Sequence, residues 1–374
     1  MKKQTVVVLS VSVGAGHLRA AEALKVTVEK LYNDIKVIHL DVMDLVPAQF
    51  RKLYVDTYLN IVQHHPSLWG QVYRFTDRQK KSSRLNNMRK NIERFNTQSL
   101  HKMLVDLQPE HVICTHFLPA SILSQMIEKK KFAGSTWVVD TDFDIHAMWI
   151  HEGMSGYFAA DDEIAWRMRG RGIDSARIHV TGIPIMPEFS KKLDRESCAG
   201  ELKINPNKTT VLMMSGGTGL GEIDMLAEQL VKLQGDFQII ALAGKNASLL
   251  GKLNKIALQY PDRLFPMGFT NAVERVMAVS DLAITKPGGL TTSECLAMEL
   301  PMIIVAPLPG QEERNADFLL EHGVAMKAYD APGLEYRVNK LLKQPNCLAE
   351  MRRRLQGIGK PHAARDILRI ILEE

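Results

Sequence analysis

A histidine preceded by two glycines is the first feature of the chain that could do chemistry. The segment Val-Gly-Ala-Gly-His, residues 13–17, follows a continuous apolar run from Val6 to Leu9 and precedes a helical pattern of apolar residues. Such a strand, glycine turn and helix place the turn at the carboxyl edge of a parallel sheet, where α/β domains bind ligands. The helix N-terminus disfavours the imidazolium, so we expect a neutral His17 that can accept a proton. A histidine that only caps the helix is the structural alternative.

A second glycine turn, Gly216 to Gly219, follows the apolar strand pattern that begins at Thr209. Neither turn contains the Lys-Ser/Thr of a P-loop, and neither completes the dinucleotide fingerprint G-x-G-x-x-G, so the sequence argues against a dehydrogenase. Small residues at such a turn allow backbone N–H groups to approach an oxyanion or phosphate at a helix start. A tight structural bend is the alternative interpretation of the second turn.

The densest cluster of polar residues lies in the last third of the chain. Residues 281–294, D-L-A-I-T-K-P-G-G-L-T-T-S-E, predict a short strand, a glycine turn and a helix opened by hydroxyl residues. Glu294 would lie in the first turns of this helix, where it could accept hydrogen bonds from the vicinal hydroxyls of a sugar. Residues 307–315, P-L-P-G-Q-E-E-R-N, add amides, acids and an arginine on a loop that prolines stiffen. A solvated loop is the alternative for each residue taken alone.

The composition is that of a soluble globular protein with room for two domains. The chain has 374 residues, of which 45% are hydrophobic and 24% charged. Its four cysteines are scattered without a C-x-x-C pair, which predicts reduced thiols in a cytoplasmic protein and neither zinc nor disulfides. Ser10 and Ser12 interrupt the apolar N-terminal run, which argues against a signal peptide. No apolar segment approaches the ~20 residues needed to span a bilayer, so any work on a membrane would be done from its surface.

Positive charge is concentrated in one stretch of the chain, although the formal net charge is only +5. Nine basic residues against two acids lie between Arg74 and Lys102, just after Leu68, Trp69, Tyr73 and Phe75. This combination favours docking on an anionic surface, to which each Lys or Arg contributes up to ~1 kcal/mol. The structural alternative is a solvated helix face beside a core aromatic cluster. No nucleic-acid motif accompanies the charges.

Apolar strand-like runs alternate with helical patterns along the whole chain, and they predict two doubly wound α/β domains. The pattern breaks at residues 181–187, T-G-I-P-I-M-P, and restarts at Thr209. We therefore predict two Rossmann-like domains of similar size that face each other across a cleft. The expected boundaries are an N-terminal domain at 1–185, a linker at 186–208, a C-terminal domain at 209–355, and a last helix within 356–374 that packs back on the first domain.

Seven segments, in order from about residue 5 to 330, carry a resemblance to a known family. They are G-A-G-H-L-R-A-A, V-V-D-T-D-F with H-A-M-W-I-H, V-T-G-I-P-I, M-S-G-G-T-G-L-G, G-F-T, T-K-P-G-G-L-T-T-S-E and P-L-P-G-Q-E-E-R-N-A. Together they resemble the diacylglycerol glycosyltransferases, which comprise monogalactosyldiacylglycerol synthases and processive diacylglycerol glucosyltransferases. The resemblance implies the GT-B architecture, with a UDP-sugar in the second domain and the lipid acceptor in the first.

The resemblance also implies inverting transfer without a cofactor and without a metal ion at the diphosphate. Asp140-Thr141-Asp142 has a D-x-D pattern but lies in the first domain, away from the donor half. Glu294 matches the family's ribose-binding acid, Phe269 lies in the segment that holds uracil, and Gln311 with Glu312 matches the pair near the donor sugar. The expected donor-binding residues are Gly216, Gly217, Thr218, Gly219, Phe269, Lys286, Gly288, Gly289, Glu294, Gln311, Glu312 and Asn315.

His17 matches the histidine of the family's G-x-G-H motif, and the resemblance makes it the catalytic base. It would take a proton from the acceptor hydroxyl as that oxygen attacks the anomeric carbon. His116, Asp142, His146 and His151 are second candidates for orienting the base or the acceptor. The expected acceptor or membrane residues are Gly14, Gly16, Trp69, Tyr73, Phe75, Lys80, Lys81, Arg84, Asp142 and His146.

The resulting hypothesis is a peripheral membrane enzyme on the inner face of the cell membrane. It would move a hexose from UDP-glucose or UDP-galactose to diacylglycerol, bind anionic lipids and bind no nucleic acid. Transfer to another lipid or to a polyprenyl acceptor is one alternative. A GT-B-shaped UDP-sugar epimerase and a non-catalytic UDP-sugar sensor are the others. The sequence does not separate glucose from galactose.

Overall fold

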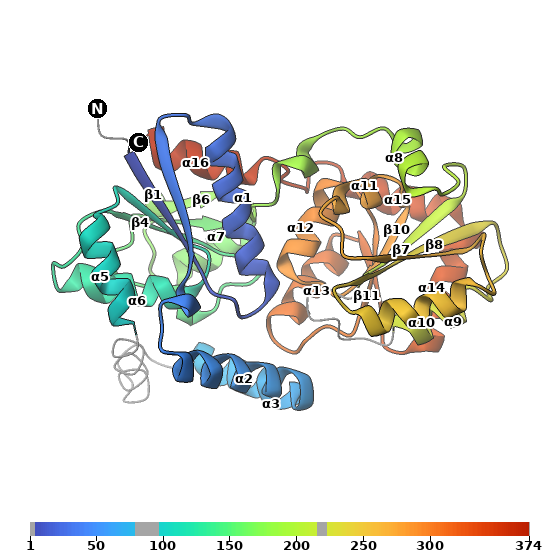
Figure 1. Ribbon diagram of the computed structural model, residues 1–374, viewed down its shortest axis with the longest axis horizontal. Coiled ribbons are helices and arrows are strands. Elements are labelled where there is room, and N and C mark those ends of the chain that lie inside the picture. The colour runs from blue at the N-terminus through green and yellow to red at the C-terminus, as the bar shows by residue number, and fades with distance from the viewer. Residues whose placement is uncertain (1–3, 79–96, 215–222, 374) are drawn as a thin grey trace. The chain divides into compact units, whose positions relative to one another are not determined.

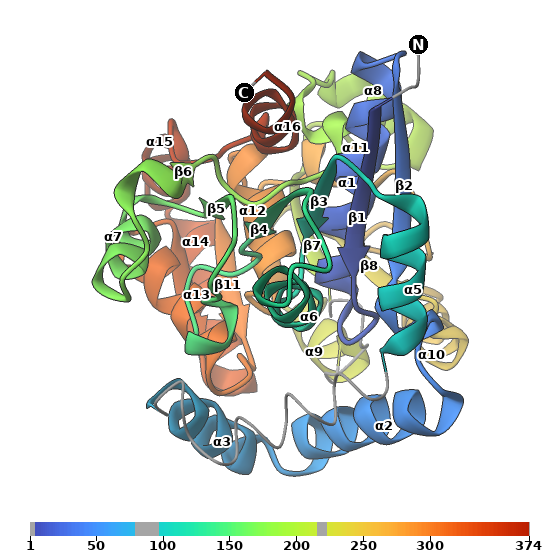
Figure 2. The same ribbon diagram turned by 90° about the vertical axis from the view of Figure 1, so that its left-hand side faces the viewer.

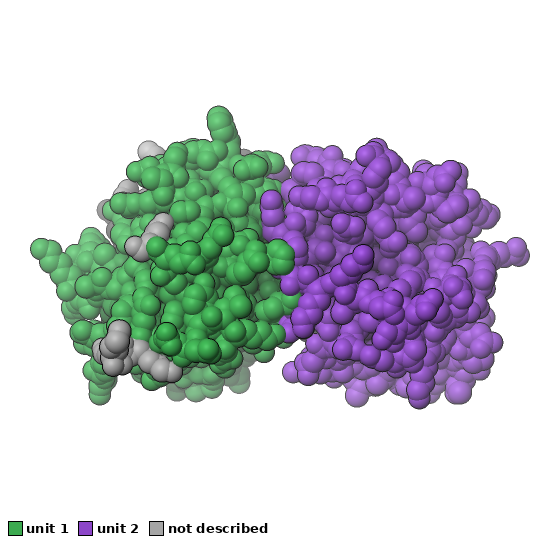
Figure 3. Space-filling view, turned by 90° about the horizontal axis from the view of Figure 1, so that it is seen from above, with its two compact units in different colours: residues 1–187, 308–311, 362–374 green, residues 188–307, 312–361 purple. Residues whose placement is uncertain are grey.

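The chain forms two compact α/β units in a computed structural model that describes residues 4–78, 97–214 and 223–373. The first unit comprises residues 1–187, 308–311 and 362–374, and the second comprises residues 188–307 and 312–361 (Figure 3). Each unit has its own parallel sheet (Figure 1). In the described part of the chain, no helix is both long enough and apolar enough to cross a membrane.

The first unit is built on a six-stranded parallel sheet with strand order β2-β1-β3-β4-β5-β6. Its strands are β1 (Gln4–Ser10), β2 (Ile35–Asp41), β3 (His111–Cys114), β4 (Ser135–Val139), β5 (Gly156–Ala159) and β6 (Ile178–Val180). Both faces of β1 are buried, which explains its run of valines rather than an alternating pattern. Because β2 and β3 lie on opposite sides of β1, the sheet has a topological switch point between β1 and β3.

Helices cover both faces of this sheet. The helices of the first unit are α1 (Ala15–Leu31), α2 (Ala48–His64), α3 (Pro66–Arg78), α5 (Gln98–Leu107), α6 (Phe117–Glu128), α7 (Asp162–Gly170) and α16 (Ala363–Glu373), with single 3₁₀ turns η1 (Val42–Asp44), η2 (Ala147–Trp149) and η3 (Ser175–Arg177). Of these, α2 and α3 lie along an edge of the unit rather than on a face of the sheet. The apolar side of α1, with Leu24 and Val28, packs on β1. Ile367 and Leu368 of α16 join the same core, so the end of the chain lies beside α1 (Figure 1).

The second unit repeats the architecture with strand order β12-β11-β10-β7-β8-β9, again parallel throughout. Its strands are β7 (Thr209–Met214), β8 (Phe237–Gly244), β9 (Leu264–Gly268), β10 (Leu282–Thr285), β11 (Met302–Val305) and β12 (Ala325–Ala328). Numbered within the unit from the opposite edge, the order is 3-2-1-4-5-6, the order of dinucleotide-binding folds. The switch point therefore lies between β7 and β10.

The helices of the second unit complete its two outer layers. They are α8 (Arg195–Leu202), α9 (Ile223–Leu230), α10 (Ala247–Ala257), α11 (Val273–Ala278), α12 (Gly289–Ala297), α13 (Gln311–Glu321), α14 (Ala331–Lys343) and α15 (Pro345–Leu355), and the 3₁₀ turn η4 (Pro187–Ser190) lies at the boundary between the units. Of the expected linker at 186–208, residues 188–208 are part of this unit. The Arg195 guanidinium fixes them by pairing with the Asp281 carboxylate and donating to the carbonyl of Lys208.

Candidate active site

The candidate base lies at the switch point of the first sheet. His17 follows β1 in the first turn of α1, Thr115 and His116 follow β3, and Thr141 follows β4. The chain enters α1 through Gly14, whose φ of +91° is the left-handed conformation that favours glycine. The carboxyl ends of the neighbouring strands β1, β3 and β4 thus bring together residues that are far apart in the sequence.

The position of the His17 ring is set by two oxygens. Its Nδ1 lies 2.9 Å from the Thr115 backbone carbonyl oxygen and 2.9 Å from Thr141 Oγ1. A carbonyl oxygen can only accept, so Nδ1 carries the proton in this hydrogen bond. The lone pair of the neutral ring is therefore on Nε2, the nitrogen that remains for a substrate. The Thr115 hydroxyl also donates to the His17 carbonyl at 2.9 Å, which holds the first turn of α1 against β3.

The environment keeps His17 uncharged. Burial lowers the pKa of the imidazole to about 4, and the hydrogen bond to the Thr115 carbonyl opposes this change only in part. The neutral state expected from the helix N-terminus thus arises mainly from desolvation of the ring. At neutral pH, His17 can accept a proton and cannot donate one from Nε2.

The ring of His116 forms one wall of the same site. It meets the His17 ring edge to face, with 4.6 Å between the centroids, and lies 4.1 Å from Phe117. Its Nδ1 accepts the Leu118 N–H and caps α6. Burial, and then the neighbouring His17, lower the pKa of His116 well below its usual value. His116 is therefore a buried neutral cap of α6 whose ring packs against the candidate base.

His146, expected in the acceptor site, joins two elements of the first unit. Its Nδ1 accepts the Met148 N–H and caps η2, while its Nε2 donates to the Tyr73 carbonyl on α3 at 2.9 Å. Burial lowers the pKa of His146 as well. The backbone of His151, in contrast, exchanges hydrogen bonds with the Tyr157 hydroxyl. These contacts give both histidines positions in the scaffold around η2.

The D-x-D segment, Asp140-Thr141-Asp142, begins a turn that follows β4. Asp140 is fully buried; its Oδ1 accepts the Asp142 N–H at 3.4 Å, and its Oδ2 has no hydrogen-bond partner in the described structure. Burial raises the pKa of Asp140 well above its usual value, and the carboxylates of Asp142 and Asp144 add to the increase. Burial thus favours the protonated, neutral form of Asp140, whereas the side chain of Asp142 is half-buried.

The aromatic residues of α3 point in different directions. The side chain of Phe75 is 60% exposed, and it shares this outer face with Leu68 and Val72. Tyr73 instead turns inward and donates its hydroxyl to Asp144 at 3.0 Å. The Trp69 indole N–H donates to Gln311 Oε1 at 3.3 Å, and both residues belong to the first unit.

Figure 2 shows α2 and α3 along the lower edge of the first unit.

Among the glycines expected near the acceptor, Gly16 is half-buried in the first turn of α1. Three of the expected basic residues, Lys80, Lys81 and Arg84, lie outside the described residues.

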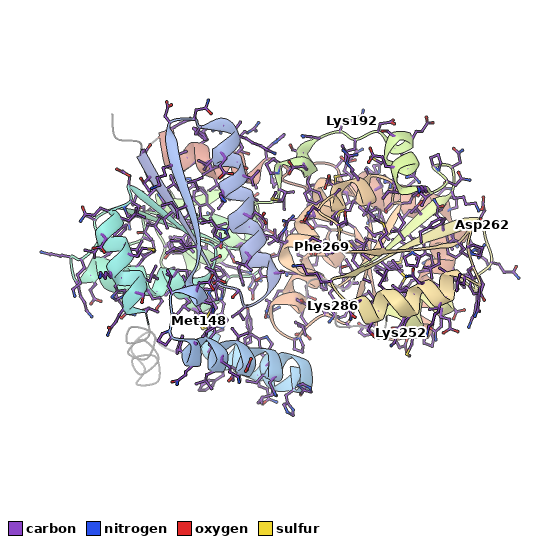
Figure 4. All side chains as sticks on the ribbon, in the orientation of Figure 1. Met148, Lys192, Lys252, Asp262, Phe269 and Lys286 are labelled. Atoms are coloured by element: carbon purple, nitrogen blue, oxygen red, sulfur yellow. The ribbon has the colours of Figure 1, made fainter. Side chains whose placement is uncertain are left out.

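Several of the expected donor residues in the described part of the second unit lie near the carboxyl ends of its strands. Gly288 caps α12 without a side-chain hydrogen bond, and Glu294 is half-buried in the second turn of that helix. Figure 4 shows Phe269 and Lys286 at the same end of this unit's sheet. Phe269 is 59% exposed, with Lys245 Nζ 5.0 Å from the centre of its ring. The turn after β7, with Gly216, Gly217, Thr218 and Gly219, lies outside the described residues.

Lys286, which directly follows β10, is the cationic side chain among the expected donor residues. Burial lowers the pKa of its ammonium group, and the nearby Glu312 carboxylate acts in the opposite direction. Asn315 is fully buried, and its Nδ2 donates to the Pro287 carbonyl at 2.9 Å. Asn315 thus holds the turn from β10 to Gly289 in place, a structural contact that the sequence did not reveal.

Comparison with known proteins gives the family. Residues 17–185 match the monogalactosyldiacylglycerol (MGDG) synthase family, and residues 210–367 match the C-terminal domain of glycosyltransferase family 28. The chain is 30% identical over 272 residues to the processive diacylglycerol beta-glucosyltransferase of Bacillus pumilus, covering 72% of this chain and 70% of that protein. The chain belongs to the diacylglycerol glycosyltransferases. The Bacillus licheniformis protein of the same name is 28% identical over 377 residues, and this match covers 99% of this chain and 95% of that protein.

Two solved structures extend the fold of this glycosyltransferase to more distant proteins. Acinetobacter baumannii MurG matches with a TM-score of 0.64 at 15% identity, over 99% of this chain and all of that chain. The UDP-GlcNAc 2-epimerase from Neisseria meningitidis, bound to UDP-GlcNAc, matches with a TM-score of 0.60 at 14% identity, over the same shares of the two chains. These likenesses concern the fold alone, and they agree with two Rossmann-like units of the GT-B class.

Two residues of the glycosyltransferase's candidate site were not predicted for this role. Thr115 and Thr141 contact the His17 ring from positions 98 and 124 residues away in sequence. A signal was present, since Thr115 directly follows the buried run His111–Cys114 and Thr141 comes two residues after Val139. Polar residues just beyond buried parallel strands lie at the ligand edge of a sheet.

Proposed function

We propose that this protein transfers a hexose from a UDP-sugar to the free hydroxyl of 1,2-diacylglycerol, with inversion, to give a β-glycosyl diacylglycerol. Glucose is the proposed hexose, because the relatives that match nearly the full chain are named beta-glucosyltransferases. The MGDG synthase match makes galactose the competing choice. The observation that carries the proposal is a neutral His17 with its Nδ1–H engaged by a carbonyl and its Nε2 left for an acceptor.

The proposed chemistry is a single displacement. The acceptor oxygen forms a bond to the anomeric carbon as the bond from that carbon to the diphosphate oxygen breaks, and the hydroxyl proton passes to His17 Nε2. Attack from the face opposite the diphosphate inverts an α-linked donor to a β-linked product. UDP leaves with the bonding electron pair, and its negative charge requires stabilisation.

The second unit supplies groups suited to that donor. We propose that Lys286 and the backbone N–H groups at the start of α12 meet the diphosphate, where the helix dipole also favours negative charge. Glu294 is the proposed acceptor for the ribose hydroxyls. The exposed ring of Phe269 lies in the segment proposed to hold uracil. Gln311, which belongs to the first unit, is assigned to the donor sugar together with Glu312 of the second unit.

We further propose that the outer face of α3 meets the lipid surface at the inner face of the cell membrane. Leu68, Val72 and Phe75 present exposed apolar side chains there, and Arg74 is exposed beside them. An apolar strip with adjacent basic residues suits an anionic leaflet. Diacylglycerol would then reach His17 from a membrane that the protein already touches.

An epimerase is the second candidate, because the fold is shared with a UDP-GlcNAc 2-epimerase. The two reactions differ in their need for lipid: an epimerase converts its UDP-sugar without vesicles, whereas the proposed reaction requires an acceptor. A non-catalytic UDP-sugar sensor would bind the nucleotide without turnover. Transfer to a polyprenyl or other lipid acceptor would give a lipid-linked product of different mass.

The test is transfer of labelled hexose from UDP-glucose and, in parallel, UDP-galactose to diacylglycerol in anionic vesicles. We expect a labelled glycolipid whose anomeric proton has the large coupling constant of a β-hexoside, with glucose preferred. Isomerised UDP-sugar in the absence of vesicles would support the epimerase instead. UDP binding without any lipid product from diacylglycerol would contradict the proposed acceptor.

A further inference from the structure

The hydroxyl of Thr141 is a buried polar group that the reaction above does not use. Thr141 is 3% exposed at the end of β4, and its Oγ1 lies 2.9 Å from His17 Nδ1. Within the described parts of the chain, the structure shows no other hydrogen-bond contact for Thr141 Oγ1. A buried hydroxyl aimed at the far side of a candidate base suggests a role in setting the state of that base.

The Thr115 carbonyl fixes the direction of the bond. If Nδ1 lacked a proton, its lone pair would face the carbonyl oxygen at 2.9 Å, and the two acceptors would repel each other. With the proton on Nδ1, the carbonyl accepts it and a lone pair of Thr141 Oγ1 faces the same N–H. The two oxygens therefore select one tautomer and one ring orientation, and Nε2 stays free.

The same oxygens face the charge that forms when Nε2 takes a proton. An imidazolium N–H makes a stronger hydrogen bond than a neutral one, so each acceptor on Nδ1 favours the protonated ring. A carboxylate commonly fills this position beside a catalytic histidine. In the described structure no carboxylate is hydrogen-bonded to His17, and Asp140 behind Thr141 is held in its neutral form by burial.

We propose that Thr141 is a positioning residue, a neutral counterpart of that carboxylate, which orients His17 with the Thr115 carbonyl and shares the charge developing on the ring. This inference rests on the proposed function of His17 as base. It explains a site that turns over a neutral lipid without placing a fixed negative charge against the base. A weakly basic histidine then releases its proton readily after each transfer.

The surroundings of Thr141 are rigid enough for such a role. The Asp140 N–H donates to the Phe158 carbonyl on β5 at 3.1 Å, and the Asp140 carboxyl accepts the Asp142 N–H. These bonds fix the turn on both sides of Thr141. On the other side of the ring, Thr115 is fully buried and its hydroxyl donates to the His17 carbonyl. A base held by such preorganised groups needs no rearrangement when it reacts.

The test compares Thr141→Val, which keeps the shape and removes the hydroxyl, with Thr141→Ser, which keeps the hydroxyl. We expect Thr141→Val to lower kcat about tenfold, with KM for diacylglycerol changed less than twofold, and Thr141→Ser to retain most of kcat. The acid limb of the pH profile should shift to lower pH by about one unit in Thr141→Val, because the lost acceptor disfavours the imidazolium. A residue that only supports the fold would lower the amount of active protein and leave this limb in place.

A readout that needs no transfer keeps the inference separate from the proposed function. The ¹⁵N shifts of His17, recorded with labelled protein at pH 7, should give the Nδ1–H tautomer in the intact protein and a shifted Nδ1 resonance in Thr141→Val and Thr141→Ala. Unchanged Nδ1 shifts, or an unchanged kcat in Thr141→Val, would overturn the role of Thr141. If the intact protein transfers no hexose while the shifts behave as expected, the proposed reaction fails and the positioning contact stands.

Discussion

At the scale of single residues, the candidate site of the first unit is built from groups that burial keeps neutral. The pKa of His17 is lowered to about 4, that of His116 is lowered well below the usual histidine value, and that of Asp140 is raised. Each shift has the same cause, since a low dielectric disfavours whichever form is charged. In the described structure, the groups that contact the His17 Nδ1 atom are therefore an uncharged carbonyl and an uncharged hydroxyl.

The first residue-scale prediction concerns pH. His17 must be neutral to act as a base, and with its pKa lowered to about 4 it is neutral throughout the range in which an ordinary histidine titrates. We expect kcat/KM for transfer to stay level from about pH 7 down to about pH 5 and to fall only near pH 4. An acid limb centred near pH 6.5 would show that His17 is solvated or is not the base.

The second residue-scale prediction concerns stability. The pKa of Asp140 is raised in the folded state, so the folded protein keeps a proton that the unfolded chain releases, and this costs stability as pH rises above about 4. Asp140→Asn supplies a neutral group of the same shape. It should raise the free energy of unfolding at pH 7 by about 1 kcal/mol or more, with a smaller gain at pH 4.

Urea unfolding at the two pH values measures this effect, and Asp142→Asn, at a half-buried position in the same turn, is the matched control. Equal changes for both variants at both pH values would mean that Asp140 is ionised in the folded protein.

At the scale of elements, the segment from β4 to η2 links the base to helix α3. Thr141 contacts His17 at one end of this segment, and Asp144 and His146 bind Tyr73 at the other. Asp77 extends the attachment by accepting the Ala147 N–H and pairing with Arg171. An element with an exposed apolar face is thus tied to the loop that orients the candidate base.

The prediction at this scale is that α3 is held to the segment by the Tyr73 hydroxyl. Tyr73→Phe removes the bond to Asp144 and leaves that carboxylate without this donor. We expect the free energy of unfolding to fall by about 1 kcal/mol and α3 to become more sensitive to limited proteolysis. Phe75→Leu on the exposed face is the control, since its side chain makes no inward contact of this kind. Equal protease sensitivity for the two variants would contradict the attachment.

At the scale of the whole molecule, the candidate residues are distributed over two units of the same architecture. The first carries the candidate base and the exposed α3 face, and the second carries the proposed donor residues around β10 and α12. The proposed reaction requires both, together with a lipid surface.

A vesicle experiment tests the membrane contact. Phe75→Glu places a charge on the outer face of α3, where the native side chain is 60% exposed, and Leu258→Glu places one at an 83% exposed position in the second unit. Burying a phenylalanine is worth about 2 kcal/mol, so Phe75→Glu should weaken binding to anionic vesicles roughly tenfold or more. Leu258→Glu should bind like the intact protein. Co-sedimentation at low and moderate salt distinguishes the variants, and equal loss in both would exclude α3 as the contact.

Much of this organisation is visible in the sequence. Buried parallel strands have continuous apolar runs, and glycine turns mark their carboxyl ends, so the two Rossmann-like units and the position of His17 at a ligand edge were predictable. The partners of His17 were not, because hydrogen bonds that span 98 and 124 residues leave no periodic signal. The inward turn of Tyr73 depended on Asp144, whose contact to α3 exists only in the folded chain.

The most direct test of the account is a paired measurement on the intact protein and His17→Ala. Transfer of labelled glucose from UDP-glucose to diacylglycerol in anionic vesicles is measured beside the affinity of each protein for UDP. We predict that His17→Ala loses at least about a hundredfold in kcat, since general base catalysis contributes on this scale, while UDP affinity is unchanged. Transfer that survives the substitution, with the same UDP affinity, would contradict His17 as the base.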